Sequence, residues 1–150
     1  MLASVEELQQ KGIKFELRQL VKPAYTAKDV EDLGIPLSQV LKSLLFIGDE
    51  PIMVVLQGTK KVDLQKLKKL MHFRDIRLAT KEETLQLTSY PIGSVSAFGL
   101  KKEIKKVLDK KALDEYEFHI CAGEPDKNIV LSNQQLLKAA KWIIEDISQS

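Results

Sequence analysis

Residues 43–56 have the sequence SLLFIGDEPIMVVL, in which two apolar runs flank a turn segment, Gly48 to Pro51. Each run is short, apolar and bounded by turn-forming residues, which is typical of a hairpin of two well-buried strands. Short strands and short helices are predicted on both sides of this hairpin, without the regular alternation of a βαβ fold. The sequence therefore predicts an α+β chain with a curved, partly closed mixed sheet surrounded by helices.

Local signals place the other elements. Helices are expected after five capping positions: from the capping box at Ser4–Glu7 to Gly12, from Thr26 to Leu33 with Gly34 ending it, from Asp63 to Leu70, from Thr80 to Thr88, and from Ser132 or Asn133 onward. The last helix is predicted to be long, with an apolar face of Leu136, Leu137, Ala140, Ile143, Ile144 and Ile147. Strands are expected at 15–20, 77–79, 106–109, 117–121 and 129–131.

Composition bounds the class of protein. The 150 residues fit one domain, predicted to span 1–150, and the 44% hydrophobic and 29% charged fractions are ordinary for a globular protein. No run of apolar residues is long enough for a membrane helix, and the acidic N-terminal segment does not resemble a signal peptide. Cys121 is the only cysteine, so no internal disulfide can form. These features predict a cytoplasmic protein.

The lysines are unevenly distributed although the net charge is only +2. One cluster comprises Lys60, Lys61, Lys66, Lys68 and Lys69, and the other comprises Lys101, Lys102, Lys105, Lys106, Lys110 and Lys111. Such clusters can bind a nucleic-acid backbone, or they can be a solvated surface. Aromatic residues are too few for a platform that stacks bases along a single strand.

Several classes of enzyme are disfavoured by what the sequence lacks. His72 and His119 have no neighbours at metal-ligand spacing, so no metal site is predicted, and His119 is expected to pack or hydrogen-bond within a strand. Cys121 also ends a strand, where a buried cysteine behaves as a small apolar residue. There is no nucleophile elbow, phosphate loop or dinucleotide fingerprint, and no cofactor is expected.

Two features have a potential chemical role. The loop Gly93-Ser94-Val95-Ser96-Ala97 contains small residues whose backbone amides can point at a developing oxyanion, although ordinary turns have a similar composition. Lys42 lies at the start of an apolar run, so its ammonium must either reach the surface or enter a polar pocket. Together they suggest a pocket that recognises a ligand through backbone groups and one cation.

Four segments resemble the YbaK/prolyl-tRNA-synthetase-associated domain family, in the same order and over almost the entire chain. They are 41–46 (LKSLLF), 62–67 (VDLQKL), 77–79 (RLA) and 88–99 (TSYPIGSVSAFG). The resemblance implies a hydrolase that removes a wrong, small amino acid from transfer RNA, in many members alanine or cysteine from the tRNA for proline. It also implies that no protein base is required, because water is assisted by a ribose hydroxyl of the substrate.

The resemblance further implies roles for individual residues. Lys42 corresponds to the family lysine that engages the tRNA 3′ end, and Gly93 through Ala97 correspond to the family's Gly-x-x-x-Pro loop, which positions the aminoacyl group. By position, the pocket is also expected to include Tyr25, Thr26, Cys121, Gly123 and Asn128. Lys60, Lys61, Lys66, Lys69, Lys101 and Lys102 are the candidates for contact with the tRNA backbone.

The chain departs from the family at two positions. The loop proline is Ala97, and the usual glycine of a Thr-Gly-Tyr segment is Ser89. Because proline fixes φ and restricts the preceding residue, Ala97 gives the loop more freedom, which puts the amino-acid specificity and the activity itself in question.

Three functions are therefore carried forward from the sequence. The first is a free-standing aminoacyl-tRNA deacylase that acts on the aminoacyl-tRNA 3′ end, alone or with an aminoacyl-tRNA synthetase, and not on DNA or membranes. The second is a module of the same fold that binds tRNA or a synthetase without hydrolysis. The third is a small-molecule-binding protein, which would be indifferent to tRNA and to salt.

Overall fold

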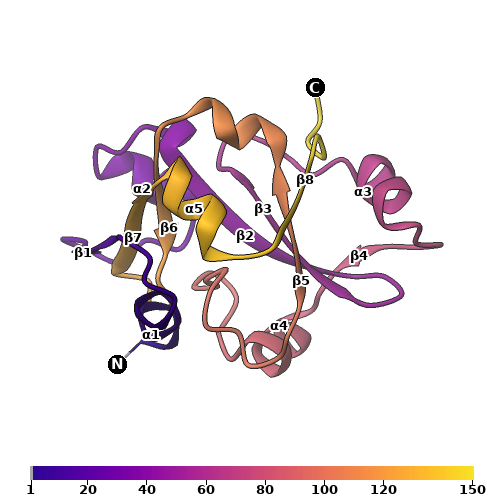
Figure 1. Cartoon of the computed structure of the whole chain (residues 1–150), viewed down its shortest axis with the longest axis horizontal. Helices are drawn as coiled ribbons and strands as arrows, with labels where there is room; N and C mark the ends of the chain where they lie inside the picture. Colours follow the sequence, from indigo (N-terminus) through magenta and orange to yellow (C-terminus); the bar gives the residue numbers. More distant parts are fainter. Residues whose placement is uncertain (1) are drawn as a thin grey trace.

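The computed structural model describes residues 2–150, over which the chain forms one mixed sheet of eight strands with five α-helices and two short 3-10 helices (Figure 1). The strands are β1 (Glu16–Gln19), β2 (Val40–Ile47), β3 (Pro51–Gln57), β4 (Arg77–Leu78), β5 (Lys105–Asp109), β6 (Glu117–Cys121), β7 (Lys127–Ser132) and β8 (Trp142–Glu145). The helices are α1 (Ala3–Gln10), α2 (Ala27–Asp32), α3 (Leu64–Met71), α4 (Lys81–Thr88) and α5 (Asn133–Ala139), with 3-10 helices η1 (Leu37–Gln39) and η2 (Lys110–Asp114). The predicted α+β class and mixed sheet are confirmed.

The predicted hairpin of two buried strands is confirmed as β2 and β3, which lie in the middle of the sheet. Its strands pair antiparallel, with Lys42 opposite Leu56 and Phe46 opposite Ile52. Residues 52–56 are fully buried, and they alternate between two cores: Met53 and Val55 pack in one, while Ile52, Val54 and Leu56 pack in the other. Because both faces of β3 are covered, its sequence is continuously apolar rather than alternating.

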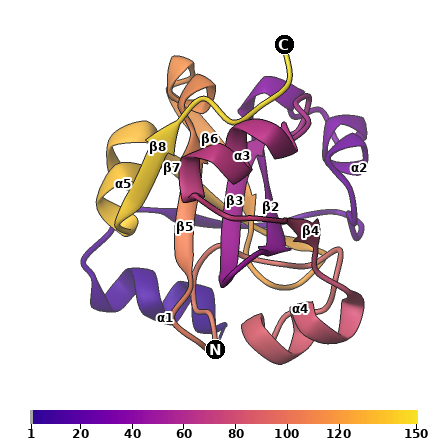
Figure 2. The ribbon, with the colours of Figure 1, turned by 90° about the vertical axis from the view of Figure 1, so that its right-hand side faces the viewer.

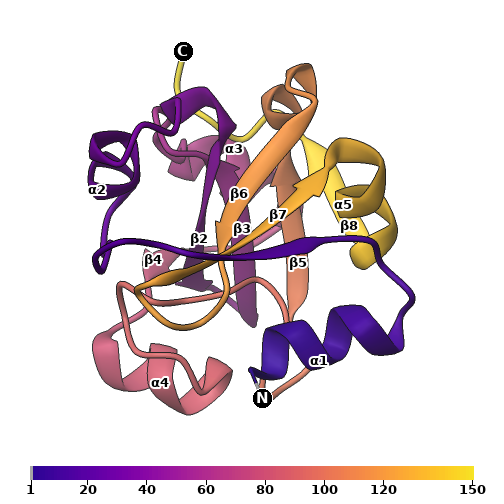
Figure 3. The same cartoon turned by 90° about the vertical axis from the view of Figure 1, so that its left-hand side faces the viewer.

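The strand order is β1-β7-β6-β2-β3-β5-β8, and β4 pairs additionally with β2. The β2–β6, β3–β5 and β5–β8 pairs are parallel, and the remaining pairs are antiparallel. The sheet forks at β2, because one end of its free edge pairs with β6 and the other end with β4. Figure 3 shows the strong curvature of the sheet, since β1 crosses in front of strands that run nearly at right angles to it.

Helices cover the sheet on both faces. Helix α3 packs over the core that contains Ile52 and Leu67, in front of β3 in Figure 2. Helices α1 and α5 contribute Leu8 and Leu136 to the larger core on the other face. Helix α2 closes a small third cluster with Val30 and Val40. Among the described residues, no helix is long and apolar enough to cross a membrane.

The prediction of one long C-terminal helix is wrong. Helix α5 ends at Ala139, Ala140 is extended, and residues 142–145 form β8, which pairs in parallel with β5. The side chains of β8 alternate, because Trp142 and Ile144 pack in the larger core and Ile143 in the smaller one. A short apolar run is compatible with the period of a helix and with that of a strand, and here pairing with the free edge of β5 favours the strand.

The predicted helix caps are confirmed at four positions and wrong at one. Thr26 and Thr80 form complete capping boxes, and Asp63 and Ser132 accept hydrogen bonds from backbone N–H groups of their helices. Helix α1 instead begins at Ala3, and Ser4 lies inside its first turn. The Ser4 hydroxyl donates to the carbonyl of Ala122, so a partner distant in sequence replaced the predicted local one.

Candidate active site

A cavity of about 650 Å³ lies beside the fork in the sheet. Its walls are residues 40–45 of β2, residues 24–28 and Val30 around the start of α2, parts of β6 and β7, and Ile92, Gly93 and Val95 after α4. Figures 2 and 3 both show α2 and α4 on the same side of the sheet, with β2 and β4 between them. The cavity therefore joins segments that are far apart in the sequence.

Strand register places a polar row on the cavity wall. Cys121 pairs with Asn128 and His119 with Val130 across β6 and β7, while Val40 pairs with His119 across β2 and β6. Paired residues, and residues two apart, project to the same face of a sheet. Lys42, His119, Cys121 and Asn128 consequently share one face, and all four line the cavity.

Lys42 is the principal cation of this wall. Its side chain is half-buried, and burial lowers the pKa of its ammonium below the ordinary value, with a further lowering from the charge of Lys61. No carboxylate within residues 2–150 raises this pKa. An ammonium that is partly desolvated and lacks an internal counterion is suited to holding a polar or anionic group of a ligand.

The loop after α4 presents only part of itself to the cavity. Gly93 and Val95 line it, whereas Ser94, Ser96 and Ala97 are buried behind the wall. Ser94 N–H donates to the carbonyl of Pro91, and Ser96 Oγ accepts from Phe98 N–H. Gly93 has φ of 89°, a conformation that favours glycine. The buried residues thus hold the loop, and Gly93 and Val95 meet the cavity.

Tyr25 and Thr26 both line the cavity. Thr26 Oγ1 accepts from the N–H of Asp29, whose carboxylate in turn accepts from the N–H groups of Tyr25 and Thr26. These backbone contacts lower the pKa of Asp29. The Thr26 side chain is therefore occupied by capping α2, while Tyr25, also on the cavity lining, is 59% exposed.

Cys121, Asn128 and Gly123 have different surroundings. Cys121 and the buried Asn128 line the cavity, but Gly123 does not. Burial raises the pKa of the Cys121 thiol, which disfavours the thiolate that a nucleophile needs. Gly123 has φ of 110°, and a Cβ there would lie 2.3 Å from the Tyr90 ring, so it shapes the turn rather than the cavity surface.

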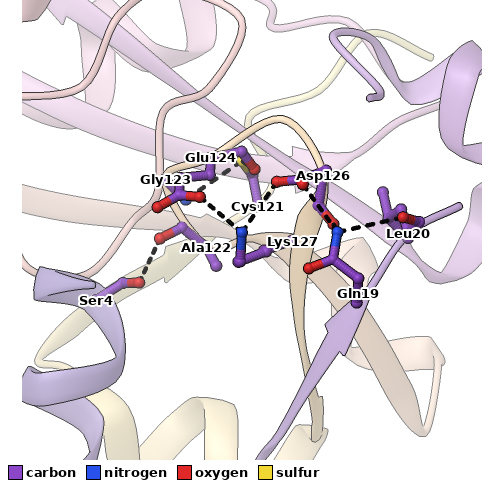
Figure 4. A network of polar contacts seen from close by, with 9 residues as sticks. All are labelled: Ser4, Gln19, Leu20, Cys121, Ala122, Gly123, Glu124, Asp126 and Lys127. Atoms are coloured by element: carbon purple, nitrogen blue, oxygen red, sulfur yellow. Dashed lines mark hydrogen bonds and ion pairs between the residues drawn. The ribbon is translucent and has the colours of Figure 1, made fainter. Parts of the chain in front are cut away.

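A network of hydrogen bonds holds the turn between β6 and β7 (Figure 4). Lys127 Nζ bonds the carboxylates of Glu124 and Asp126, and Gln19 Nε2 donates to Asp126. The Ser4 hydroxyl reaches the same turn at Ala122. Helix α1 and strand β1 thereby fix the end of β6 that contains Cys121.

The interpretation of His119 from the sequence missed its position on the cavity wall. His119 is only 4% exposed, its Nε2 lies 3.8 Å from a carboxylate oxygen of Glu117, and its Nδ1 has no hydrogen-bond partner among residues 2–150. Burial and, secondarily, the charge of Arg18 lower its pKa, so the imidazole is neutral at pH 7. Strand alternation with Cys121 is the signal that could have placed it there.

Ser43 is a second residue that the sequence interpretation did not select. It lines the cavity from β2, and its Oγ is buried with no hydrogen-bond partner in the described chain. Its neighbours in sequence are apolar on one side and Lys42 on the other, which gave no local reason to single it out.

The lysine candidates are dispersed around the molecule. Lys61 lies near enough to Lys42 to lower its pKa, and Lys60 precedes it at the end of the hairpin. Lys66 is bound to Asp146 at 3.2 Å and to the carbonyl of Ser148 at 3.0 Å, and Lys69 lies in the last turn of α3. Lys101 and Lys102 are exposed before β5, away from the cavity lining.

Comparison with known proteins identifies the family. A sequence model of the aminoacyl-tRNA editing domain matches residues 21–139. The chain belongs to the aminoacyl-tRNA editing domain family. Its matched region includes the whole cavity wall described above.

The similar proteins include synthetases, of which the chain covers a minor part, and one protein that it covers over most of its length. The chain is 35% identical to proline–tRNA ligase of Thermotoga neapolitana over 73% of its length and 30% identical to that of Thermotoga maritima over 93%. It spans only 19% and 26% of the length of these two proteins. EbsC of Enterococcus faecalis, named as a candidate Cys-tRNA(Pro)/Cys-tRNA(Cys) deacylase, is 27% identical over 79% of the chain and 73% of EbsC.

Solved structures agree on the fold of the editing domain. A crystal structure described as a candidate trans-editing enzyme for prolyl-tRNA synthetase has a TM-score of 0.90 at 25% identity and covers 99% of this chain and 96% of its own. A protein called APE2540 has a TM-score of 0.89 at 24% identity, covering 98% of this chain and 99% of its own.

Proposed function

We propose that residues 1–150 act as one free-standing editing domain that deacylates mischarged aminoacyl-tRNA. The observation that carries the proposal is the half-buried Lys42 ammonium on the wall of a cavity that Gly93 and Val95 also line, in a chain of the editing family. Lys42 would hold the 3′-terminal nucleotide, and the loop would position the aminoacyl group. The protein would act in the cytoplasm, where its substrate is made.

The chemistry requires little from the protein. An aminoacyl ester is already activated, so positioning its carbonyl, stabilising the developing oxyanion and admitting water are sufficient. The raised thiol pKa of Cys121 argues against a covalent intermediate on sulfur. Water is therefore the nucleophile in this proposal, assisted by a ribose hydroxyl of the substrate as the family resemblance implies.

The proposed substrates carry small amino acids such as alanine, cysteine or serine on a non-cognate tRNA, including the tRNA for proline. A synthetase separates side chains that differ by one methylene by only about 1–3 kcal/mol, so hydrolytic editing is needed for this size class. The likeness to editing segments of proline–tRNA ligases and to EbsC supports this choice. An aminoacyl-tRNA synthetase is the proposed protein partner, without a role for DNA or membranes.

A deacylation screen tests the proposal. Purified protein is incubated with tRNAs that carry alanine, serine, cysteine or threonine, including tRNA for proline, and release of the amino acid is measured against the uncatalysed rate. Accelerated release from at least one mischarged tRNA is expected. Binding of tRNA without accelerated release from any would instead support the non-catalytic module, and indifference to tRNA and salt would support a small-molecule-binding protein.

A further inference from the structure

The edge of β2 next to the cavity has an unusual gap in its pairing. On this edge, pairing with β6 stops at Leu41, opposite Ile120, and pairing with β4 starts at Phe46, opposite Leu78. Within the described residues, the segment between these two ladders has no partner strand on this side. The same segment forms one wall of the cavity.

The direction of the backbone groups in this gap follows from the hydrogen bonds around it. The carbonyl of Val40 accepts from Gly58 N–H, on the β3 side, and the carbonyl of Leu45 accepts from Ala79 N–H, on the β4 side. The N–H and C=O of one strand residue point to the same side, and successive residues alternate. Ser43 lies two residues before Leu45, so its N–H and C=O both point into the gap.

Ser43 therefore presents one donor and one acceptor without a partner strand. Its hydroxyl is also buried and without a hydrogen-bond partner among residues 2–150. Backbone N–H and C=O groups are strong hydrogen-bonding groups, which folded proteins pair with other protein groups or with water. A ligand that offers one acceptor and one donor at matching spacing would satisfy this position.

The aminoacyl group has this pattern. Its α-ammonium and its ester carbonyl are separated by one carbon, as are the N–H and C=O of a residue in a strand. In an antiparallel hydrogen-bonded pair, the N–H of each residue donates to the C=O of the other. Peptides recognised by strand addition bind to free sheet edges in the same way.

We propose that the backbone of Ser43 binds the aminoacyl group as one residue of an added antiparallel strand. The Ser43 carbonyl accepts from the substrate's α-ammonium, and the Ser43 N–H donates to the ester carbonyl oxygen. This inference rests on the proposed function, because it assigns a subsite for the aminoacyl ester. It predicts recognition of any α-amino acyl group, with the remaining cavity walls selecting the side chain.

The same contact assists hydrolysis. Water oxygen bonds to the ester carbon, and the carbonyl electron pair moves to its oxygen, next to the Ser43 N–H. Collapse of the tetrahedral intermediate expels the ribose oxygen, which takes up the proton lost by the water. The products are the free amino acid and tRNA, and the Ser43 N–H stabilises the negative charge that exists only along this path.

A proline substitution tests the donor. At an unpaired edge position, proline removes an N–H that the sheet does not use, so Ser43→Pro is expected to fold. Its reference is Ser43→Ala, since both variants lack the hydroxyl and only one lacks the N–H. Relative to Ser43→Ala, Ser43→Pro should lower kcat/KM on mischarged tRNA by about 10²-fold, the effect of removing one oxyanion donor. Equal kcat/KM in the two folded variants would overturn the proposal.

A comparison of two substrates and an NMR titration test the proposal even if Ser43→Pro does not fold. The rate acceleration is the rate with protein divided by the uncatalysed rate of the same substrate. For the unmodified protein, this acceleration should be about 10-fold or more lower on propionyl-tRNA than on alanyl-tRNA, because the propionyl group lacks the α-ammonium. Its Ser43 amide resonance should shift with 3′-deoxy-3′-(L-alanylamino)adenosine and shift less with the propionyl analogue. Equal acceleration, or an unmoved Ser43 resonance, counts against the inference. Turnover with an unmoved Ser43 contradicts this inference alone, whereas no turnover on any aminoacyl-tRNA contradicts the proposed function.

Discussion

Lys42 is the side chain on which the proposed chemistry depends most. Its ammonium lies on the cavity wall, where burial lowers its pKa and no carboxylate of the described chain raises it. Replacing Lys42 breaks no ion pair among the described residues, so the substitution should weaken the contact with the substrate and leave the stability of the fold nearly unchanged.

We therefore expect Lys42→Ala to lower deacylation by at least about 10²-fold while the melting temperature changes little. The measurements are single-turnover hydrolysis and thermal unfolding followed by circular dichroism. Lys138→Ala, in the last turn of α5 and outside both lysine clusters, is the control for removal of a lysine side chain. Retained turnover in Lys42→Ala would reject the assignment of this residue.

His119 links the cavity wall to the pH dependence of stability. Its pKa in the folded protein is lowered from 6.5, first by burial and then by the charge of Arg18. Because the unfolded chain binds a proton more readily than the folded chain, the free energy of unfolding falls as the pH decreases below about 6.5 and through the folded pKa.

Denaturant unfolding between pH 7.5 and pH 5 tests this sign. The difference in unfolding free energy between the unmodified protein and His119→Gln should shrink or reverse toward pH 5, because glutamine does not titrate. Carboxylates that titrate in this pH range are present in both proteins, so their contributions cancel in the difference in unfolding free energy. A difference that is independent of pH would show that His119 has no altered pKa.

Ala97 is the residue at which the loop departs from the Gly-x-x-x-Pro pattern that the family resemblance implies. It is fully buried behind the wall formed by Gly93 and Val95, and its N–H donates to no backbone carbonyl of the described residues. Proline would remove no backbone hydrogen bond here and would restrict Ser96 to extended conformations.

Ala97→Pro is accordingly expected to change the preference among mischarged tRNAs more than it changes stability, which should shift by about 1 kcal/mol or less. Relative kcat/KM values for alanyl, seryl, cysteinyl and threonyl substrates provide the comparison. Identical relative kcat/KM values for Ala97→Pro and the unmodified protein would contradict this expectation.

At the scale of elements, the end of α4 shows a local strain. Ser89 follows the helix with φ of 70°, a left-handed conformation that costs a non-glycine residue about 1 kcal/mol. The following residue, Tyr90, is buried and donates from its hydroxyl to the carbonyl of Phe98, so the tertiary structure holds this conformation in place.

Ser89→Gly should therefore raise the free energy of unfolding by up to about 1 kcal/mol. Ser89→Ala, which removes the same hydroxyl but retains a Cβ, serves as the control and should give no such gain. Equilibrium unfolding in urea measures both. Equal stability of the glycine and alanine variants would contradict the explanation by backbone strain.

At the scale of the whole molecule, the positions of the lysines bear on how tRNA would bind under the proposed function. Lys60 and Lys61 follow the central hairpin, and Lys61 lies near Lys42. Lys101 and Lys102 are exposed on a segment outside the cavity lining. Binding through phosphate groups weakens with salt in proportion to the number of phosphates bound.

We expect Lys60→Gln with Lys61→Gln to weaken tRNA binding and to reduce the slope of log affinity against log salt by about 1 for each phosphate group that the variant no longer binds. The pair Lys101→Gln with Lys102→Gln is the comparison and should have the smaller effect. The reverse order of effects would place the tRNA body on the other lysine cluster.

The sequence by itself determined the elements whose signals are local. The buried hairpin and the caps at Thr26, Asp63 and Thr80 all follow from neighbouring residues. These signals depend on side-chain period and on backbone N–H groups within one turn, which no distant contact needs to supply.

Only the tertiary structure decided the pairing of β8 with β5, the exchange of the Ser4 cap for a contact with Ala122, and the composition of the cavity wall. It placed Ser94, Ser96 and Ala97 behind that wall and brought His119 and Ser43 onto it. The fork at β2 depends on three strands that are distant in sequence, and the free edge at Ser43 exists only where their ladders end. Such gaps arise from non-local pairing, which local periodicity does not encode.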